Sequence, residues 1–215
     1  MTERLDSRNG RSAVTLEIAG IGGVEVRSVS QTDPLAAPLI AELADEYSSR
    51  YGGTREAVFE DLTTYPAEEF ATPCGALLVL VHDGQPVAGG AFRQFDSVTA
   101  ELKRIWTSSD HRRRGLGKIV VRELELEIAR RGYRKVYLTT GPRQPEAVAL
   151  YLSCGYTPLY DATLSPLEVG IHPFEKELRI RHDYDRRAPA ALPKTVSRDR
   201  EAWLHEVAAS LRVIG

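Results

Sequence analysis

The chain has 215 residues, of which 42% are hydrophobic and 27% charged, with 17 Gly and 12 Pro. This length and balance fit one globular domain with extensions and exclude disordered, fibrous and repeat proteins. The 28 basic and 30 acidic side chains leave a formal net charge of -2, so no bulk positive field is available to gather nucleic acid.

Three features bear on where the protein works. Residues 1–12 are polar and mixed in charge, and we expect them to form a flexible N-terminus. No apolar run reaches the roughly 18 residues that a membrane span needs, so no membrane partner is expected. Cys74 and Cys154 allow at most one disulfide and stand at no metal-ligand spacing. These observations favour a cytoplasmic protein without a metal.

The first third of the chain predicts a hairpin and then two helices. Residues 13–19 and 24–29 are strand-like and flank a glycine-rich turn. The Asp-Pro pair at residues 33–34 starts a helix in which leucine and tyrosine recur every four positions until the glycine pair at residues 52–53. A second, shorter helix is predicted over residues 54–62.

The rest of the domain alternates between strands and helices. Prolines place residues 67–70 in a loop or a single turn. Apolar spacing predicts one helix from Gly115 to Gly132, and Pro145 starts another that ends at Ser153. Extended segments are predicted at residues 76–81, 87–95, 99–107, 136–140, 157–160 and 174–180.

Residues 181–215 are predicted to be a proline-containing linker followed by a C-terminal helix. In that helix Trp203, Val207 and Leu211 lie on one face. An apolar face of this kind needs a partner, so we expect the helix to fold over the domain or to form a homodimer.

The most informative stretch is residues 111–118, with the sequence HRRRGLGK, between a predicted strand and the first turn of a helix. Its glycines let the backbone approach a ligand closely, and unpaired amides at a helix start favour anions. Arg112, Arg113 and Arg114 can add charge-assisted contacts. The stretch therefore predicts a phosphate or pyrophosphate site.

Two common phosphate-binding loops do not fit these residues. A Walker loop needs glycine at position 112 and serine or threonine at position 119, where the chain has Arg112 and Ile119. A dinucleotide fingerprint needs a third glycine where the chain has Val120, and the preceding sheet looks antiparallel.

The loop resembles the acyl-coenzyme A loop of the GNAT superfamily of N-acyltransferases, in which Arg or Gln is followed by two residues, Gly, one residue and Gly or Ala. Arg112, Gly115 and Gly117 match this pattern. The resemblance extends to AELKRIWT at residues 100–107 and AVALYLSCGY at residues 147–156. Three ordered blocks are more specific than the loop alone.

This resemblance implies a mixed α+β domain over residues 13–180, built on a twisted, mainly antiparallel sheet flanked by helices. It also implies a coenzyme cleft where the fourth and fifth strands diverge. The implied activity is acetyl transfer to an amine, with acetyl-CoA as co-substrate and no metal.

In similar enzymes the loop amides hold the coenzyme A pyrophosphate, and the strand before the loop hydrogen-bonds the pantetheine arm. Gln144 replaces the asparagine that is common three residues before the helix alanine, which changes its reach toward the pantetheine or the splayed strands. Carried over to this chain, the coenzyme-binding residues are Ile105, Trp106, Thr107, Arg112, Arg113, Arg114, Gly115, Leu116, Gly117, Lys118 and Gln144.

Amine acetylation needs a base for the amine proton and an acid for the departing thiolate. The resemblance makes Glu101 the candidate base, often acting through water, and Tyr151 the candidate acid. A strand carboxylate facing a partly apolar cleft is expected to have a raised pKa. Two alternatives stay open: Glu101 is a solvent-facing charge or pairs with Lys103 or Arg104, and Tyr151 is a core tyrosine.

The acceptor region in similar enzymes corresponds to the part of this chain that holds Glu60, Asp61, Glu68 and Glu69. We expect Glu68 and Glu69 to attract a cationic amine, and the acceptor to be a small primary amine rather than a protein. Direct attack in a ternary complex is expected because neither cysteine has a recognisable histidine partner.

Two rival functions remain open at this point. The loop could belong to a sensor or interaction module that binds acetyl-CoA with little or no catalysis. The arginines of the loop and the basic tail could instead bind nucleic acid, but the negative net charge makes this the weaker option, and no nucleic-acid partner is expected.

Overall fold

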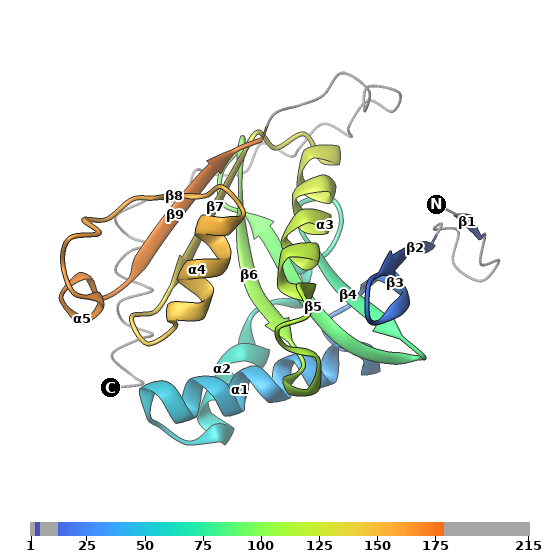
Figure 1. The fold of residues 1–215 in the computed structure, drawn as a ribbon, viewed down its shortest axis with the longest axis horizontal. Helices are drawn as coiled ribbons and strands as arrows, with labels where there is room; N and C mark the ends of the chain where they lie inside the picture. The colour runs from blue at the N-terminus through green and yellow to red at the C-terminus, as the bar shows by residue number, and fades with distance from the viewer. Residues whose placement is uncertain (1–2, 5–12, 179–215) are drawn as a thin grey trace.

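The computed structural model describes residues 3–4 and 13–178. They form a nine-stranded sheet in the order β1-β2-β3-β4-β5-β6-β7-β9-β8, flanked by helices (Figure 1). The strands are β1 (Glu3–Arg4), β2 (Ala13–Ile18), β3 (Gly22–Val29), β4 (Ala76–His82), β5 (Gln85–Gln94), β6 (Thr99–Thr107), β7 (Lys135–Thr140), β8 (Thr157–Pro158) and β9 (His172–Glu177). The helices are α1 (Ala37–Tyr51), α2 (Arg55–Thr64), α3 (Leu116–Arg130), α4 (Pro145–Ser153) and α5 (Pro166–Val169). Short 3-10 turns lie at Pro34–Ala36, Ala67–Phe70 and Ser109–His111.

One pair of neighbouring strands differs from all others in the described ranges. Every pair is antiparallel except β6 and β7, which are parallel. Their pairing covers only residues 99–101 of β6 and 135–137 of β7, and the two strands then separate (Figure 1). The predicted mixed α+β fold with a mainly antiparallel sheet is confirmed.

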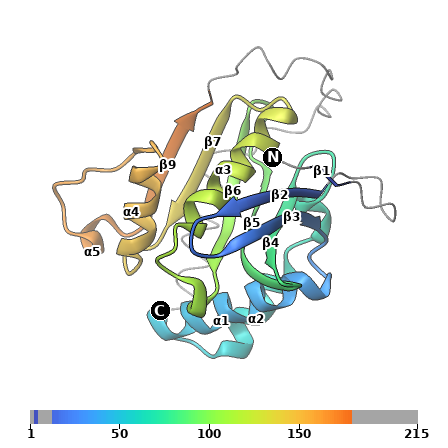
Figure 2. The ribbon, with the colours of Figure 1, turned by 45° about the vertical axis from the view of Figure 1, so that its right-hand side comes forward.

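The sheet is buried on both faces. Leu78 and Leu80 of β4 belong to the core formed with α3, whereas Leu77, Val79 and Val81 belong to a second cluster on the opposite face. Helices α3 and α4 cover the first face, and α1 packs against the other (Figure 2). Because successive strand residues point to opposite faces, a strand covered on both sides reads as a continuous apolar run.

Polar side chains cap the turn that leads into α1 and the first turn of α2; the sequence predicts the first of these caps and a helix start at Thr54 for the second. The Asp33 side chain accepts a hydrogen bond from the Leu35 amide at 2.8 Å, and Pro34 opens the turn that leads into α1. Gly52, with a φ of 88°, follows its last residue. Thr54 caps α2 in the same way, because its hydroxyl accepts from the Ala57 amide at 3.2 Å.

Several predicted boundaries are corrected by the structure. Gly22 and Gly23 belong to β3 rather than to the hairpin turn, β8 ends at Pro158 rather than at residue 160, and β9 begins at His172. The predicted connection before β9 contains α5, which begins with a capping box formed by Ser165 and Glu168. This box is a local signal, and a four-residue helix carries no apolar stripe that could reveal it.

Residues 3–4, predicted as part of a flexible N-terminus, form β1 and pair with β2. The remaining residues of that segment, and the predicted linker and C-terminal helix at residues 181–215, lie outside the described part. None of the described helices combines the length and apolar character needed to cross a bilayer.

Candidate active site

A β-bulge in the middle of β6 shapes the site. Gly89 and Ala91 of β5 pair with Trp106 and Lys103 of β6, so one residue of β5 faces two residues of β6. Arg104 is one of the two, and its φ of 59° lies in the left-handed region that residues with a side chain rarely adopt.

The bulge reverses the alternation of side chains along β6. Leu102 and Ile105 pack on the α3 face, whereas Trp106 packs against Leu39 and Leu43 of α1. The Trp106 ring is 3% exposed, and its Nε1 donates a hydrogen bond to the Glu42 carboxylate at 3.1 Å. The predicted coenzyme contact of Trp106 can therefore come from its backbone but not from its ring.

A cavity lies where β6 and β7 separate. No described strand pairs with the β7-facing edge of β6 after residue 101, so the backbone groups of that edge are available to a ligand. The cavity has a volume of about 230 Å³. It is lined by Tyr47, Tyr51, Val58, Asp61, Leu62, Tyr65, Phe70, Leu102, Lys103, Arg104, Ile105, Thr139, Thr140, Gly141, Gln144, Ala147, Tyr151 and Ile171.

Tyrosines dominate the polar part of this lining. Burial raises the pKa of Tyr47 to about 12, and it raises the pKa of Tyr151 above its usual value as well. Both phenols therefore keep their protons throughout the neutral pH range and are available as hydrogen-bond donors.

The glycine-arginine loop leads directly into α3. Gly115, with a φ of 79°, is the N-cap residue, and no described residue accepts a hydrogen bond from the amides of Gly115, Leu116 or Gly117. Leu116 is 1% exposed in the core and so offers only its amide. These unpaired amides at the positive end of a 15-residue helix form a site for an anion.

Gly117 lies where α3 and α4 pack closely together. A Cβ atom at this position would lie 3.3 Å from Leu150 Cδ2, which is tighter than most such contacts. Gly117 thus allows α3 to lie close to α4 at the loop.

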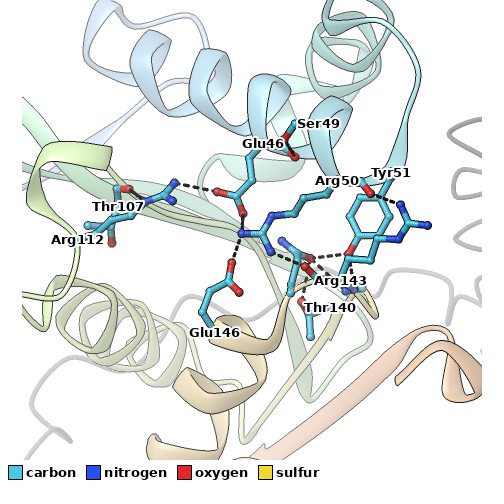
Figure 3. Close-up of polar contacts among 11 residues, drawn as sticks. Glu46, Ser49, Arg50, Tyr51, Thr107, Arg112, Thr140, Arg143 and Glu146 are labelled. Carbon is cyan, nitrogen blue, oxygen red and sulfur yellow. Dashed lines mark hydrogen bonds and ion pairs between the residues drawn. The ribbon is translucent and has the colours of Figure 1, made fainter. Parts of the chain in front are cut away.

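Ion pairs connect the loop to α1 and α4 (Figure 3). The Arg112 guanidinium is 2.9 Å from a Glu46 carboxylate oxygen, and Glu46 also pairs with Arg50 at 3.4 Å. Arg50 in turn contacts Glu146 at the start of α4 and the carbonyl oxygen of Arg143. Arg112 is therefore held by α1, whereas Arg113, Arg114 and Lys118 are exposed around the helix start.

Gln144 organises the end of β7. Its Oε1 accepts hydrogen bonds from the Thr140 hydroxyl at 3.0 Å and from the Gly141 amide at 3.1 Å. The Tyr51 hydroxyl lies 3.5 Å from the same oxygen, and a Cβ atom at Gly141 would collide with the Tyr51 ring. Gln144 thus joins the separated strand β7 to α1, and it also lines the cavity.

Tyr151 lies in α4 at the wall of the cavity. It is 6% exposed, and its ring contacts Tyr156 and Phe174 at centroid distances of 5.8 Å each. The structure therefore places a neutral, buried phenol beside the opening between β6 and β7. Its position fits both a proton donor and a core tyrosine that borders a cavity.

Glu101 occupies a different environment from the one expected. Its side chain is fully buried, with Oε2 at 2.7 Å from Arg93 Nε and Oε1 at 2.9 Å from Lys103 Nζ. Glu101 does not line the cavity. These contacts match the alternative in which Glu101 is an ion-pair partner, and its role as a base stays a prediction.

The two acidic residues expected to attract the acceptor, Glu68 and Glu69, lie outside the cavity lining. Glu69 forms an ion pair with Arg93 at 2.6 Å, and Glu68 is exposed. Neither lines the cavity, whereas Asp61 from the end of α2 does. Asp61 is therefore the one carboxylate residue among the described residues that lines the cavity.

Sequence reasoning missed several of the cavity residues. In the sequence Tyr47 belongs to the apolar stripe of a predicted helix, Tyr51 lies at the end of that helix, and Tyr65 precedes a proline in a predicted loop. None of these positions indicates a cavity.

The sequence presents Arg104 only as a possible partner of Glu101, but it bonds to Gln31 and Leu62 instead. No local signal in the sequence marks a bulge whose own residues include no glycine. Among the described residues, no group of three or more histidine, cysteine or acidic side chains could hold a metal.

Comparisons with known proteins agree with this geometry. Residues 39–156 match the family described as "Acetyltransferase (GNAT) family", which is more than half of the chain. The chain is 35% identical over 77 residues to the Bacillus subtilis protein named uncharacterized N-acetyltransferase YsnE, covering 34% of this chain and 51% of that protein. It is 44% identical over 57 residues to human N-acetyltransferase 8, covering 26% of this chain and 25% of that protein. The chain therefore spans about half or less of the curated relatives it matches.

Solved structures share the fold over nearly their full length. A Klebsiella pneumoniae protein described as an acyl-CoA N-acyltransferase has a TM-score of 0.57 and 25% identity, covering 73% of this chain and 98% of that chain. A GNAT family acetyltransferase from Elizabethkingia anophelis, solved with acetyl-CoA bound, has a TM-score of 0.51 and 16% identity, covering 72% of this chain and 98% of that chain. Because the family match spans both the loop and the diverging strands, the chain belongs to the GNAT acetyltransferase family.

Proposed function

We propose that this protein transfers an acetyl group from acetyl-CoA to the primary amine of a small molecule, by direct attack in a ternary complex. The observation that carries this proposal is a continuous arrangement of three features. Unpaired amides open α3, an unpaired backbone edge runs along β6, and a cavity begins where β6 and β7 separate. These features suit the diphosphate, the pantetheine arm and the reacting group in that order.

The residues present fit acetyl-CoA. The amides of Gly115, Leu116 and Gly117 would hold the diphosphate, with the nearby arginines adding charge. The backbone of residues 105–107 would pair with the pantetheine arm as an added strand. Family membership and the acetyl-CoA in the Elizabethkingia anophelis structure support this assignment.

In the proposed reaction, the amine nitrogen attacks the thioester carbonyl carbon, so that a C–N bond forms and the C–S bond breaks. The amine loses one proton, the thiolate gains one, and the products are an amide and free coenzyme A. A backbone amide of the β6 bulge would stabilise the negative charge that develops on the carbonyl oxygen.

Tyr151 is proposed to protonate the departing thiolate. It lines the cavity, and its raised pKa keeps the phenol protonated until the thiolate forms. Glu101 as the base would have to act through water, because it is buried outside the cavity lining. Asp61 and the tyrosine hydroxyls of the lining are other groups that a water could contact.

Direct attack is favoured over an acetyl-enzyme because neither cysteine is placed to act as the nucleophile. Neither Cys74 nor Cys154 lines the cavity. Burial raises the pKa of the Cys154 thiol, which disfavours the thiolate that a nucleophile requires.

A thiol-release assay with acetyl-CoA and a panel of small amines tests the proposal. We expect release of free coenzyme A well above hydrolysis with at least one amine, and binding of acetyl-CoA in calorimetry. Binding without turnover for any amine would favour the sensor function, and absence of binding would remove both functions. Initial rates with both substrates varied distinguish a ternary complex, with intersecting lines, from an acetyl-enzyme, with parallel lines.

A further inference from the structure

Arg104 is a buried cation without an anionic partner. The side chain is 7% exposed, and Nη1 donates to Gln31 Oε1 at 2.7 Å while Nη2 donates to the Leu62 carbonyl oxygen. Its guanidinium carbon lies 4.4 Å from the centre of the Phe70 ring. All three partners are neutral, and no carboxylate among the described residues forms an ion pair with it.

The other buried arginine on this face shows how the protein normally compensates such a charge. Arg93 is 1% exposed and pairs with Glu69 at 2.6 Å and with Glu101 at 2.7 Å. Burial alone would lower the pKa of Arg93, but these carboxylates raise it, whereas burial lowers the pKa of Arg104 to about 10. Buried charges in proteins are generally paired, so the missing anion at Arg104 calls for a ligand.

Arg104 lies in the wall of the cavity. Leu62 and Phe70, which contact its guanidinium, line the cavity together with Arg104 itself. Two of its N–H groups donate to protein acceptors, and a guanidinium has five, so donors remain for a ligand. The charged groups of the lining are Asp61, Lys103 and Arg104. Lys103 pairs with Glu101 at 2.9 Å, and Asp61 acts on Arg104 electrostatically without an ion-pair contact, so Arg104 is the lining cation that forms no ion pair with the described residues.

The bulge fixes the direction of this side chain. Arg104 keeps a φ of 59° although it is not glycine, and such conformations cost about 1 kcal/mol or more and concentrate at functional sites. Its contacts with Gln31 and Leu62 hold the guanidinium rigidly, which a selective anion site requires.

We propose that Arg104 binds a carboxylate of the acceptor, so that the acceptor is an amino acid-like molecule carrying both an amine and a carboxylate. This inference rests on the proposed acetyl transfer and narrows its acceptor. The guanidinium fork suits a carboxylate, which can accept two parallel hydrogen bonds. The remaining lining, rich in tyrosine, leucine and valine, suits an apolar or aromatic side group on the same molecule.

The test compares each acceptor with its analogue that lacks the carboxylate. We would measure kcat/KM of the full-length protein for the protein amino acids, their amides and their decarboxylated amines, such as phenylalanine, phenylalaninamide and 2-phenylethylamine. For the best amino acid we expect a roughly 10- to 100-fold preference over both analogues, because an unpaired Arg104 is left behind without the carboxylate.

Variants of Arg104 test whether this residue causes the preference for the carboxylate. In Arg104→Met the preference for the amino acid over the decarboxylated amine should fall to about 3-fold or less, and Arg104→Lys should recover part of it, since lysine keeps the charge but loses the fork. Arg55→Met removes an exposed α2 arginine that does not line the cavity, and it should leave the ratio unchanged. Circular dichroism verifies folding, and the wild-type series remains decisive where Arg104→Met does not fold.

Two negative results have different meanings. Decarboxylated amines that react as well as the amino acids with the wild-type protein would overturn the carboxylate site and leave acetyl transfer intact. An unchanged ratio in a folded Arg104→Met protein would assign the preference to another residue and likewise overturn the inference. Failure of every amine in the panel would overturn the acetyl transfer on which the inference rests.

Discussion

Tyr151 combines a buried phenol with a place in the cavity wall. If it protonates the thiolate, Tyr151→Phe should lower kcat by about 10²-fold, within the usual range for a general acid, while the affinity for acetyl-CoA stays unchanged. Steady-state kinetics and calorimetry of the two proteins measure both quantities. A Phe variant with unchanged kcat would identify Tyr151 as a core residue bordering the cavity.

The pH dependence follows from the direction of the Tyr151 shift. Burial raises the pKa of this phenol above its ordinary value of 10.0, so the acid form persists through neutral and mildly alkaline pH. Ionisation of Tyr151 should therefore cause no decline of kcat below about pH 10. A decline near pH 8 that disappears in Tyr151→Phe would contradict this environment.

Arg112 is the loop arginine that the structure ties to α1, through its ion pair with Glu46. Since it is half-exposed and near the unpaired amides, Arg112→Ala should raise the KM for acetyl-CoA by about 3- to 10-fold with little change in kcat. The rise should shrink at high salt because the contact is electrostatic. Arg130→Ala, at the far end of α3, is the matched control; an equal rise there would remove the assignment.

At the scale of elements, the packing of α3 against β5 and β6 is close at Gly90, the residue of β5 that faces the β6 bulge. A Cβ atom at Gly90 would lie 2.7 Å from Ile105 Cδ1 and 3.0 Å from side-chain atoms of Leu124 and Val120. Gly90→Ala should therefore destabilise the fold by about 1–3 kcal/mol through overpacking. Denaturant unfolding measures the change.

Gly23→Ala in β3 is the matched control for this prediction. Its Cβ atom would meet a Glu17 carboxylate oxygen at 3.4 Å, which is ordinary contact with the end of a flexible side chain. We expect a change within about 0.5 kcal/mol, as for other exposed positions. Equal costs at both glycines would show that Gly90 is not confined by the packing of α3 against β5 and β6.

One of the contacts between α1 and α4 is the ion pair of Arg50 with Glu146. Their side chains are 23% and 57% exposed, so a double-mutant cycle should give a coupling energy of only about 0.2–1 kcal/mol. Burial acts to raise the pKa of Glu146, but the hydrogen bond from Arg50 lowers it overall. The lowered pKa adds stability that is present above the unfolded-state pKa and is lost as pH falls through the folded-state value. The coupling energy should therefore vanish in acid; a coupling that persists at pH 2 would contradict the ion pair.

At the scale of the whole molecule, acetyl-CoA would contact elements that meet only in the folded state. The loop before α3, the edge of β6 and the start of α4 come from residues 105 to 144 of the chain. Saturating acetyl-CoA should raise the Tm, because a ligand at 100 times its Kd stabilises the native state by about 2.7 kcal/mol. Thermal unfolding with and without acetyl-CoA measures the shift, with S-acetylpantetheine, which keeps the thioester arm but lacks the diphosphate and the nucleotide, as the control. An equal shift by both ligands would argue against the amide site.

Much of this fold was predictable from the sequence. Asp33 as a cap and Pro34 as a first-turn proline act locally, so they mark the first helical turn in the sequence and in the structure alike. The helix predicted to start at Thr54 begins one residue later, with Thr54 as its N-cap. The prediction was wrong for short elements: the strand β8 was predicted two residues too long, and the four-residue helix α5 was not predicted. The diverging strand pair was implied only by the resemblance, since parallel pairing depends on contacts distant in the chain.

The site was predictable only in part, because its chemistry depends on pairing across elements. For Glu101 the sequence left open a base, a solvent-facing charge and a partner of Lys103 or Arg104, and the structure pairs it with Lys103 and with Arg93 of β5. Arg104 was a candidate partner of Glu101 in the sequence, and the structure instead places it in the cavity wall at the bulge.

The sequence by itself determined the backbone-level features: the glycine loop that opens α3, the caps, and the order of strands and helices, all of which are specified by neighbouring residues. The tertiary structure alone decided which buried charges are compensated. Arg93 and Arg104 are both arginines on adjacent strands, and one meets two carboxylates while the other meets neutral groups beside a cavity. That difference arises from a one-residue bulge and from the packing of α2, because a charge buried by folding is stabilised only by the groups that folding brings within reach.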